Sequence, residues 1–181
     1  MARWNIDPVH SSAQFSVRHM MVNKVRGVFS NLTGWLEFAE DTPESAQIEA
    51  TIDVSSIDTR TNDRDNHLRS PDFFDVENYP QMVFKSTSVK KTGENTGQVT
   101  GDLTIKDVTR EVTFDIEYYG QADSPFGDVR AGFSGTSKIN REDFGLTWNQ
   151  ALESGGVLVG KEVQITIELQ VVQEQQAPAT V

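Results

Sequence analysis

Hydrophobic and polar residues alternate along most of this chain, with the period of two that is typical of β-strands buried on one face. The alternation is clearest over residues 46–55 and nearly as regular over 162–173. Clusters of Gly, Asn, Asp and Pro, which favour turns, separate many of these segments. The segments with a strand pattern are 11–20, 24–38, 46–55, 82–89, 98–105, 110–119, 129–140 and 162–173. We therefore predict an all-β protein.

The number and length of these eight strands favour a closed barrel. Several span ten or more residues, where about five or six is usual. An eight-stranded antiparallel barrel has no unpaired edge, and its interior is filled by side chains or holds one small ligand. The inward faces would be apolar, and Ala46, Ala50, Gly101, Ala131 and Gly135 would leave room inside. The pattern alone leaves a filled barrel or a sandwich as alternatives.

One long segment, residues 57–75, lacks the strand pattern and is dense in charged residues. A polar connection of this length between two strands is typical of a functional loop or a lid. We predict that it closes one mouth of the barrel with two short helices. One helix would lie near residues 63–69, and the other would have Ser70 as its N-cap and Pro71 in the first helical position.

The aspartates of this segment do not match a calcium-binding loop. Counting from Asp63, the sixth position holds no glycine, and Phe74 stands at the twelfth, where a bidentate Glu belongs. We expect the acidic residues instead to cap helices and to pair with arginines. A guanidinium also matches planar anionic groups, so an arginine at the mouth would suit a ligand head group. The arginines of the segment are Arg60, Arg64 and Arg69.

Composition narrows the classes of function. The 181 residues fit one domain, 1–173, followed by a polar tail, 174–181, that we expect to fray. A formal net charge of −11 argues against nucleic-acid binding and disfavours anionic membrane surfaces. The absence of cysteine excludes disulfides, zinc-thiolate sites and thiol nucleophiles. The N-terminus has no signal-peptide pattern and no apolar stretch reaches the length of a membrane span, so we predict a cytoplasmic protein without membrane insertion.

Residues that could perform chemistry are sparse. His10 and His19 have opposite strand parity and His67 lies in the long loop, so no two histidines have the spacing of metal ligands. Nucleotide-binding, hydrolase and zinc-protease motifs are absent. We therefore predict no catalytic residue, no metal and no cofactor. His19 shares a face with Phe15 and Val17, where a histidine is more often a core residue, although in a hollow barrel it would orient a ligand.

Several motifs, taken together, carry a family resemblance. They are W-N-I-D-P-V-H-S-S-A-Q-F-S-V-R-H-M (4–20), V-R-G-V-F (25–29), I-D-T-R-T-N-D-R-D-N-H-L-R-S-P-D-F-F-D (57–75), Y-P-Q-M-V-F-K-S-T (79–87), G-D-L-T-I-K-D-V-T-R (101–110), I-N-R-E-D-F-G-L-T-W (139–148) and V-G-K-E-V-Q-I (159–165). With them the chain resembles the YceI-like family of polyisoprenoid-binding or lipid-binding domains, from Trp4 to about Val172. It departs from many relatives at Asp107, where they carry Gly, and in lacking their signal peptide.

The resemblance implies an eight-stranded antiparallel, lipocalin-like barrel with the long helical loop at one mouth. Its apolar pore would hold a polyisoprenoid, an isoprenoid quinone or a fatty amide, for transport or storage and without a reaction. The family is also compatible with a homodimer. Two other interpretations remain: a stress-associated interaction protein with a filled barrel, and an isoprenoid-modifying enzyme with His19 or His67 as its base.

Strand parity and the apolar residues of the loop predict the ligand contacts, while Arg60, Arg64 or His19 would meet the head group. Each buried CH₂ contributes about 0.8 kcal/mol, so about 20 enclosed carbons offer on the order of 16 kcal/mol. The cost of association is roughly 4 to 15 kcal/mol, so micromolar binding needs no charged anchor. The predicted ligand-binding residues are Phe15, Val17, His19, Val25, Phe29, Ile48, Ile52, Arg64, Leu68, Phe73, Phe74, Phe84, Phe114, Ile116, Phe133 and Trp148.

Overall fold

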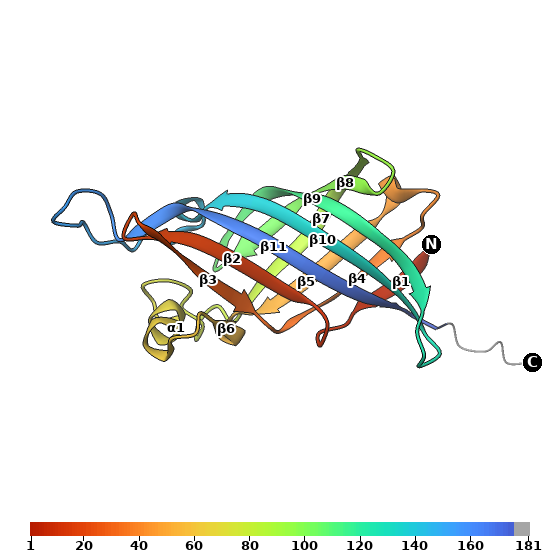
Figure 1. Ribbon diagram of the computed structural model, residues 1–181, viewed down its shortest axis with the longest axis horizontal. Coiled ribbons are helices and arrows are strands. Elements are labelled where there is room, and N and C mark those ends of the chain that lie inside the picture. The colour runs from red at the N-terminus through yellow and green to blue at the C-terminus, as the bar shows by residue number, and fades with distance from the viewer. Residues whose placement is uncertain (176–181) are drawn as a thin grey trace, which may run out of the picture.

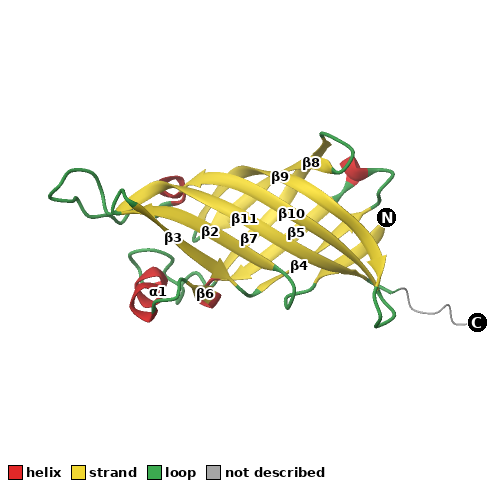
Figure 2. Ribbon diagram, in the orientation of Figure 1, coloured by secondary structure: helices red, strands yellow, loops and turns green. Residues whose placement is uncertain are grey.

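The computed structural model describes residues 1–175, which form an elongated β-barrel with one α-helix and short 3₁₀ helices at its periphery (Figures 1 and 2). The strands are β1 (Ala2–Ile6), β2 (Ser12–His19), β3 (Asn23–Phe29), β4 (Leu32–Phe38), β5 (Gln47–Asp53), β6 (Ile57–Asp58), β7 (Gln81–Lys91), β8 (Thr96–Ile105), β9 (Val108–Asp123), β10 (Val129–Asn140) and β11 (Val159–Gln173). The helices are η1 (Pro43–Ser45), η2 (Val54–Ser56), α1 (Asn62–Arg69) and η3 (Arg141–Phe144). Most of the tail predicted to fray, residues 176–181, lies outside the described part of the chain.

These eleven segments make eight barrel strands, because three of the eight are interrupted. β1 and β2 lie end to end along β11, with Ile6 opposite Val171 and Ser12 opposite Glu168. β4 and β3 pair with β1 and β2, and β5 and β6 pair with β4 and β3. The order continues through β7, β8, β9 and β10 back to β11, with antiparallel pairing throughout. The prediction of an eight-stranded antiparallel barrel is confirmed.

Two features near the N-terminus differ from the predicted strands. The pattern did not predict β1, although Trp4 and Ile6 alternate with exposed residues there. The segment predicted as one strand, 24–38, is broken at Asn31, whose carbonyl accepts a hydrogen bond from the Asp53 N–H at 3.0 Å. The break matches an interruption in the neighbouring strand. β4 pairs with β5 and β3 pairs with β6, and η2 separates β5 from β6.

A hydroxyl bridges the gap between β1 and β2. Gln170 on β11 faces this gap, so its backbone groups lack a strand partner there. Its carbonyl accepts hydrogen bonds from the Asp7 N–H at 2.8 Å and from the Ser11 hydroxyl at 3.2 Å. Its N–H donates to Ser11 Oγ at 3.0 Å. Because Ser11 is buried, this pairing keeps polar backbone groups of β11 satisfied where the barrel closes.

The loop predicted as a lid contains one helix instead of two. The helix expected at residues 63–69 is confirmed as α1. The second helix is wrong, since the residues after Ser70 form turns. Ser70 is extended and caps the C-terminus of α1. Both its N–H and its hydroxyl donate hydrogen bonds to the carbonyl of His67. The Ser70 carbonyl then accepts from the N–H groups of Phe73 and Asp75, so the chain folds back at once.

We expect the substitution Ser11→Ala to destabilise the barrel by about 1–3 kcal/mol, because it leaves the buried N–H of Gln170 without a partner. Denaturant unfolding of the purified protein would measure this change. Ser12→Ala is the matched control, since the Ser12 hydroxyl has only a 3.5 Å contact from Gln14. Equal stability of the two variants would contradict the role assigned to Ser11.

Candidate ligand-binding cavity

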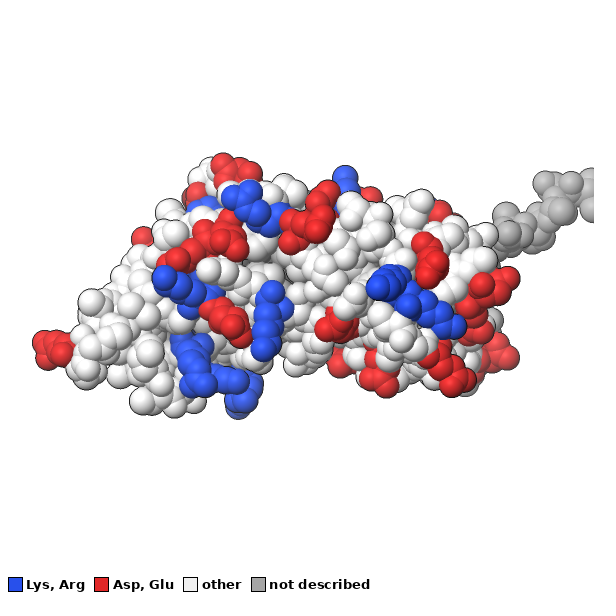
Figure 3. Space-filling model, turned by 90° about the horizontal axis from the view of Figure 1, so that it is seen from above, with Lys and Arg blue, Asp and Glu red and all other residues white. Residues whose placement is uncertain are grey.

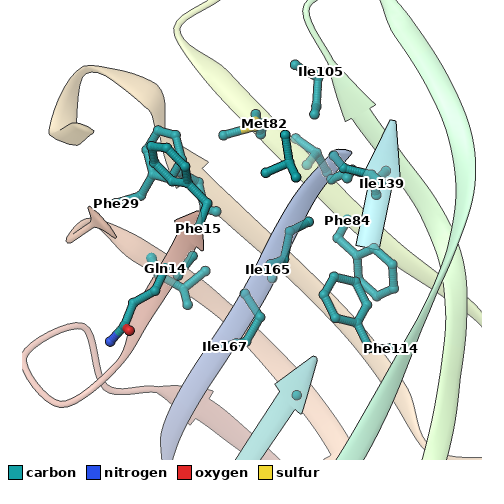
Figure 4. A pocket seen from close by; sticks show the side chains of 18 of the residues that line it. Gln14, Phe15, Phe29, Met82, Phe84, Ile105, Phe114, Ile139, Ile165 and Ile167 are labelled. Carbon is teal, nitrogen blue, oxygen red and sulfur yellow. The ribbon is translucent and has the colours of Figure 1, made fainter. Parts of the chain in front are cut away.

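The barrel encloses an apolar cavity of about 220 Å³. Its wall is built from inward-facing residues of most of the barrel strands, chiefly Phe, Ile, Leu and Val. Figure 4 shows Phe84 and Phe114 on one side and Phe15 and Phe29 on another, with the amide of Gln14 pointing away from this apolar group. A cavity with this lining favours long apolar molecules over polar ones.

Strand parity placed most of the predicted contacts correctly on the cavity wall, although their part in ligand binding stays a prediction. The phenylalanines pack edge to face in places: the ring centroids of Phe84 and Phe114 are 5.4 Å apart at 85°. The predicted residues that line the cavity are Phe15, Val17, Phe29, Ile48, Ile52, Leu68, Phe73, Phe74, Phe84, Phe114, Ile116 and Phe133.

Four of the predicted contacts, His19, Val25, Arg64 and Trp148, lie outside this wall. His19 and Val25 belong to the far end of the β2–β3 hairpin, beyond Val28, the last residue toward the tip at which β3 still pairs with β6. β3 has no strand partner on its other side there, although Val17, opposite Val25, and Val159, opposite His19, still line the cavity. Trp148 packs behind the wall, with its ring centroid 5.4 Å from that of Phe73.

The prediction also missed much of the wall. The most regular omission is the inward row of β11, whose alternation was visible in the sequence but was not used to choose contacts. The omitted residues of this row are Val159, Val163, Ile165, Ile167 and Leu169. Others, such as Leu146 of the loop after η3, carry no periodic pattern that would have pointed to the cavity.

The lid covers one end of the cavity with Leu68, Phe73 and Phe74. Phe74 packs edge to face on Phe29, with ring centroids 5.8 Å apart. Phe29 in turn lies 5.5 Å from Phe15, so the lid continues the aromatic wall of β2 and β3. This contact joins the loop to the barrel through apolar surface.

Thr59, which is only 2% exposed, lies at the centre of the hydrogen bonds that connect the polar residues of the lid. Its N–H donates to Asp65 Oδ1 at 2.8 Å, and its hydroxyl donates to the same oxygen. Arg64 donates from Nε to Thr59 Oγ1 at 2.8 Å and from Nη2 to the Thr59 carbonyl at 2.6 Å. The threonine thus connects a buried carboxylate with a guanidinium.

The predicted pairing of aspartates with arginines in the lid is therefore wrong for the residues described. Arg64 bonds to Thr59, and Arg69 donates to the carbonyls of Ile57 at 3.0 Å and Ser55 at 3.2 Å. A side-chain hydrogen bond within residues 57–75 joins His67 Nε2 and Asp72 Oδ2, at 2.9 Å. The arginines are used to satisfy backbone carbonyls of an irregular loop, which has no ladder of its own. This also explains why Arg64 does not face the cavity.

Arg141 is the one charged residue on the wall of this cavity in the described chain. It is buried, and it donates to the carbonyls of Leu146 at 2.6 Å, Gly160 at 2.7 Å and Val159 at 3.3 Å. Burial lowers the pKa of its guanidinium, and the adjacent Glu142 partly opposes this shift. The three bonds fasten the connection after η3 to β11 and place a cation at the border of the apolar cavity.

A second cavity of about 380 Å³ adjoins the first and reaches the opposite end of the barrel. The two share Ile48, Ile116 and Phe133 among their wall residues. Here Tyr118 stacks on Phe133 and donates its hydroxyl to Glu40 at 2.6 Å. Burial, followed by this hydrogen bond, raises the pKa of Tyr118 above its ordinary range. The apolar interior thus leads to a polar opening between strand ends.

A closed eight-stranded barrel with an apolar interior defines a lipocalin-like fold. The sequence model of the YceI-like domain matches residues 4–171. The chain belongs to the YceI-like family. The helices within residues 1–175 are too short or too polar to span a bilayer.

Relatives and solved structures are similar over nearly the whole chain. UPF0312 proteins of Staphylococcus epidermidis and Staphylococcus aureus are 45% and 41% identical over 165 residues, 91% of this chain and 94% of theirs. BcnA of Burkholderia cenocepacia has a TM-score of 0.80 at 25% identity, covering 91% of this chain and 98% of BcnA. A polyisoprenoid binding domain of Saccharophagus degradans has a TM-score of 0.71 at 14% identity, covering 96% and 100%, which shows the shared fold alone.

We expect Thr59→Val to destabilise the protein by about 1–3 kcal/mol, because Arg64 Nε then loses its buried acceptor. Thr59→Ser keeps the hydroxyl and is expected to lose much less. The free energy of unfolding of both variants would be measured in denaturant. A serine variant as unstable as the valine variant would show that the hydroxyl does not hold the lid.

Proposed function

We propose that this protein binds a long-chain apolar lipid inside its barrel and carries or stores it. The lipid would be a polyisoprenoid, an isoprenoid quinone or a fatty amide. The observation that carries the proposal is the enclosed cavity, whose wall combines many Phe, Ile, Leu and Val side chains with a single charged residue, Arg141. A filled barrel, as an interaction protein would have, offers no such space.

The shape of the interior supports an extended ligand. The two adjoining cavities follow the barrel from the lid to the opening near Tyr118, so a chain could lie along the axis with its polar end at that opening. The wall consists mainly of hydrogen-bonded strands, which are ordered before binding. Preorganisation of this kind reduces the ordering cost that binding would otherwise incur.

The chemistry of the wall supports a binding role without catalysis and without a cofactor. None of the three histidines, all within the described residues, borders the main cavity. His10 Nδ1 lies 2.8 Å from Asp7 at the surface, and His67 pairs with Asp72. A proposed isoprenoid-modifying enzyme would need a base within hydrogen-bond reach of its substrate. A cytoplasmic location and a homodimer stay predictions.

The first test is native mass spectrometry of the purified protein, followed by organic extraction and identification of the extracted lipid. We expect a stoichiometric added mass of several hundred daltons that disappears on extraction. If the protein is empty and also fails to bind isoprenoid quinones and polyprenyl lipids on titration, the proposal is wrong.

A substitution that fills the cavity tests where the lipid lies. Ile165 on β11 points into the cavity, whereas its neighbour Gln164 is exposed. We expect Ile165→Trp to weaken binding of a polyprenyl lipid at least tenfold, because the indole occupies volume that the chain needs. Gln164→Trp is the matched control and should bind as the unaltered protein does. Equal binding by both variants would exclude this cavity as the lipid site.

A further inference from the structure

The hairpin between β2 and β3 exposes an apolar tip. Met20, Met21 and Val22 are 49%, 54% and 83% exposed, and they follow one another directly. Met20 and Met21 have φ angles of 53° and 62°, a left-handed region that residues other than glycine seldom adopt. The turn therefore holds three consecutive apolar side chains out in solvent, where a residue suited to the turn would be polar or glycine.

Basic residues flank this tip. Arg18, Lys24 and Arg26 are all exposed, and Arg18 stands directly opposite Lys24 in the β2–β3 register. Like charges in such a pair repel each other. Within residues 1–175, none of the three takes part in an ion pair. The hairpin thus carries three uncompensated positive charges around an apolar centre.

The sequence around the hairpin is free of acidic residues. The chain contains 27 Asp and Glu among 181 residues, yet none lies between Pro8 and Leu36. In the view of Figure 3, Asp and Glu side chains crowd the end of the molecule near the C-terminal trace, while in the other half Lys and Arg side chains lie among Asp and Glu. Charged residues are therefore unevenly distributed, and the net charge of −11 for the whole chain does not describe the hairpin.

The hairpin lies at one end of the ligand cavity. Val17 on β2 is part of the cavity wall, and the tip begins only three residues later. The loop at residues 149–158 packs beside it, with the Met20 N–H donating to the Leu158 carbonyl at 2.8 Å. In Figure 1 this loop and the hairpin project together from the end of the barrel that carries α1, away from both termini.

We propose that the β2–β3 hairpin, residues 18–26, docks on the surface of an anionic lipid bilayer. Met20, Met21 and Val22 would enter the interface, and the three cations would contact anionic head groups. The proposal goes beyond lipid binding in the barrel, because it names the surface by which the protein would approach a membrane. It also revises the expectation, drawn from net charge alone, that anionic membranes are disfavoured.

The hairpin can dock despite the negative net charge of the protein, because the most acidic end of the barrel is far from the hairpin. β11 has 15 residues and is therefore about 50 Å long, and the tilt of barrel strands reduces the distance between the two ends of the barrel to about 40 Å. At physiological ionic strength the screening length is about 8 Å, and the acidic end hardly affects the hairpin. Exposed carboxylates at this end of the barrel (Figure 1) oppose docking: Glu153 in the adjoining loop and Asp58, Asp63 and Asp72 in the lid. The cations of the hairpin differ from them in flanking the exposed apolar tip directly.

The test is cosedimentation of the full-length protein with vesicles. One set would consist of phosphatidylcholine with about 30 mol % phosphatidylglycerol, and the other of phosphatidylcholine alone. Each cation near an anionic surface contributes about fivefold to partitioning, so the double variant Lys24→Glu, Arg26→Glu should lose at least about 25-fold. The matched control is Lys90→Glu, Lys91→Glu, which changes net charge equally at the opposite end and should bind vesicles as before.

A second pair of variants tests the apolar tip. Met21→Ser, Val22→Ser keeps every charge and should also weaken binding to the anionic vesicles, whereas Ser12→Ala, on the same strand pair but away from the tip, should not.

The proposal fails if the unaltered protein does not prefer anionic vesicles, or if the Lys90 and Lys91 variant loses as much as the hairpin variant. Native mass spectrometry of every variant separates this result from lipid binding in the barrel. Hairpin variants that retain their lipid but no longer sediment would support docking alone.

Discussion

β11 pairs with three strands, and the closed barrel depends on these pairings. Along one side it follows β10 over residues 162–172, and along the other it meets β2 and then β1. The two short strands leave a gap opposite Gln170, which Ser11 and Asp7 fill with hydrogen bonds. A barrel can enclose an apolar space only if its backbone groups are paired all the way round, because an open edge would admit water.

The hollow interior costs the barrel packing contacts. Side chains around a cavity lose contacts that a filled core would provide. Two clusters of densely packed residues remain: one includes Val54, Ile57 and Phe144, which are nearly completely buried, and the other surrounds Trp4 and Val171. The Trp4 indole N–H has no hydrogen-bond partner among the described residues, so that packing is obtained at the expense of one polar group. The first of these clusters also contains residues that line the cavity, such as Phe29, Met82 and Phe114, so packing and ligand space share one set of inward-facing side chains.

The polar residues of the lid illustrate how an irregular loop becomes ordered. Thr59, Arg64 and Arg69 bond chiefly to backbone carbonyls and to one another, and the apolar side chains Phe73 and Phe74 face the cavity. The charge density of the segment therefore serves the loop itself. The basic hairpin differs in this respect, since Arg18, Lys24 and Arg26 have no such partners in residues 1–175 and remain available to an external surface.

The sequence alone determined the class of fold and most of the inward faces, because a strand buried on one side must alternate and each long strand here does so. It also located the lid and the helix α1. Tertiary structure decided the rest. The strand β1 is too short for its pattern to stand out, and it exists because β4 and β11 supply partners. Parity could not show that His19 and Val25 lie outside the cavity wall, because it does not show that β3 loses its second strand partner beyond Val28. Nor could it assign Arg64 to Thr59 in place of an aspartate, because a charged side chain bonds to whichever group the folded backbone brings within reach.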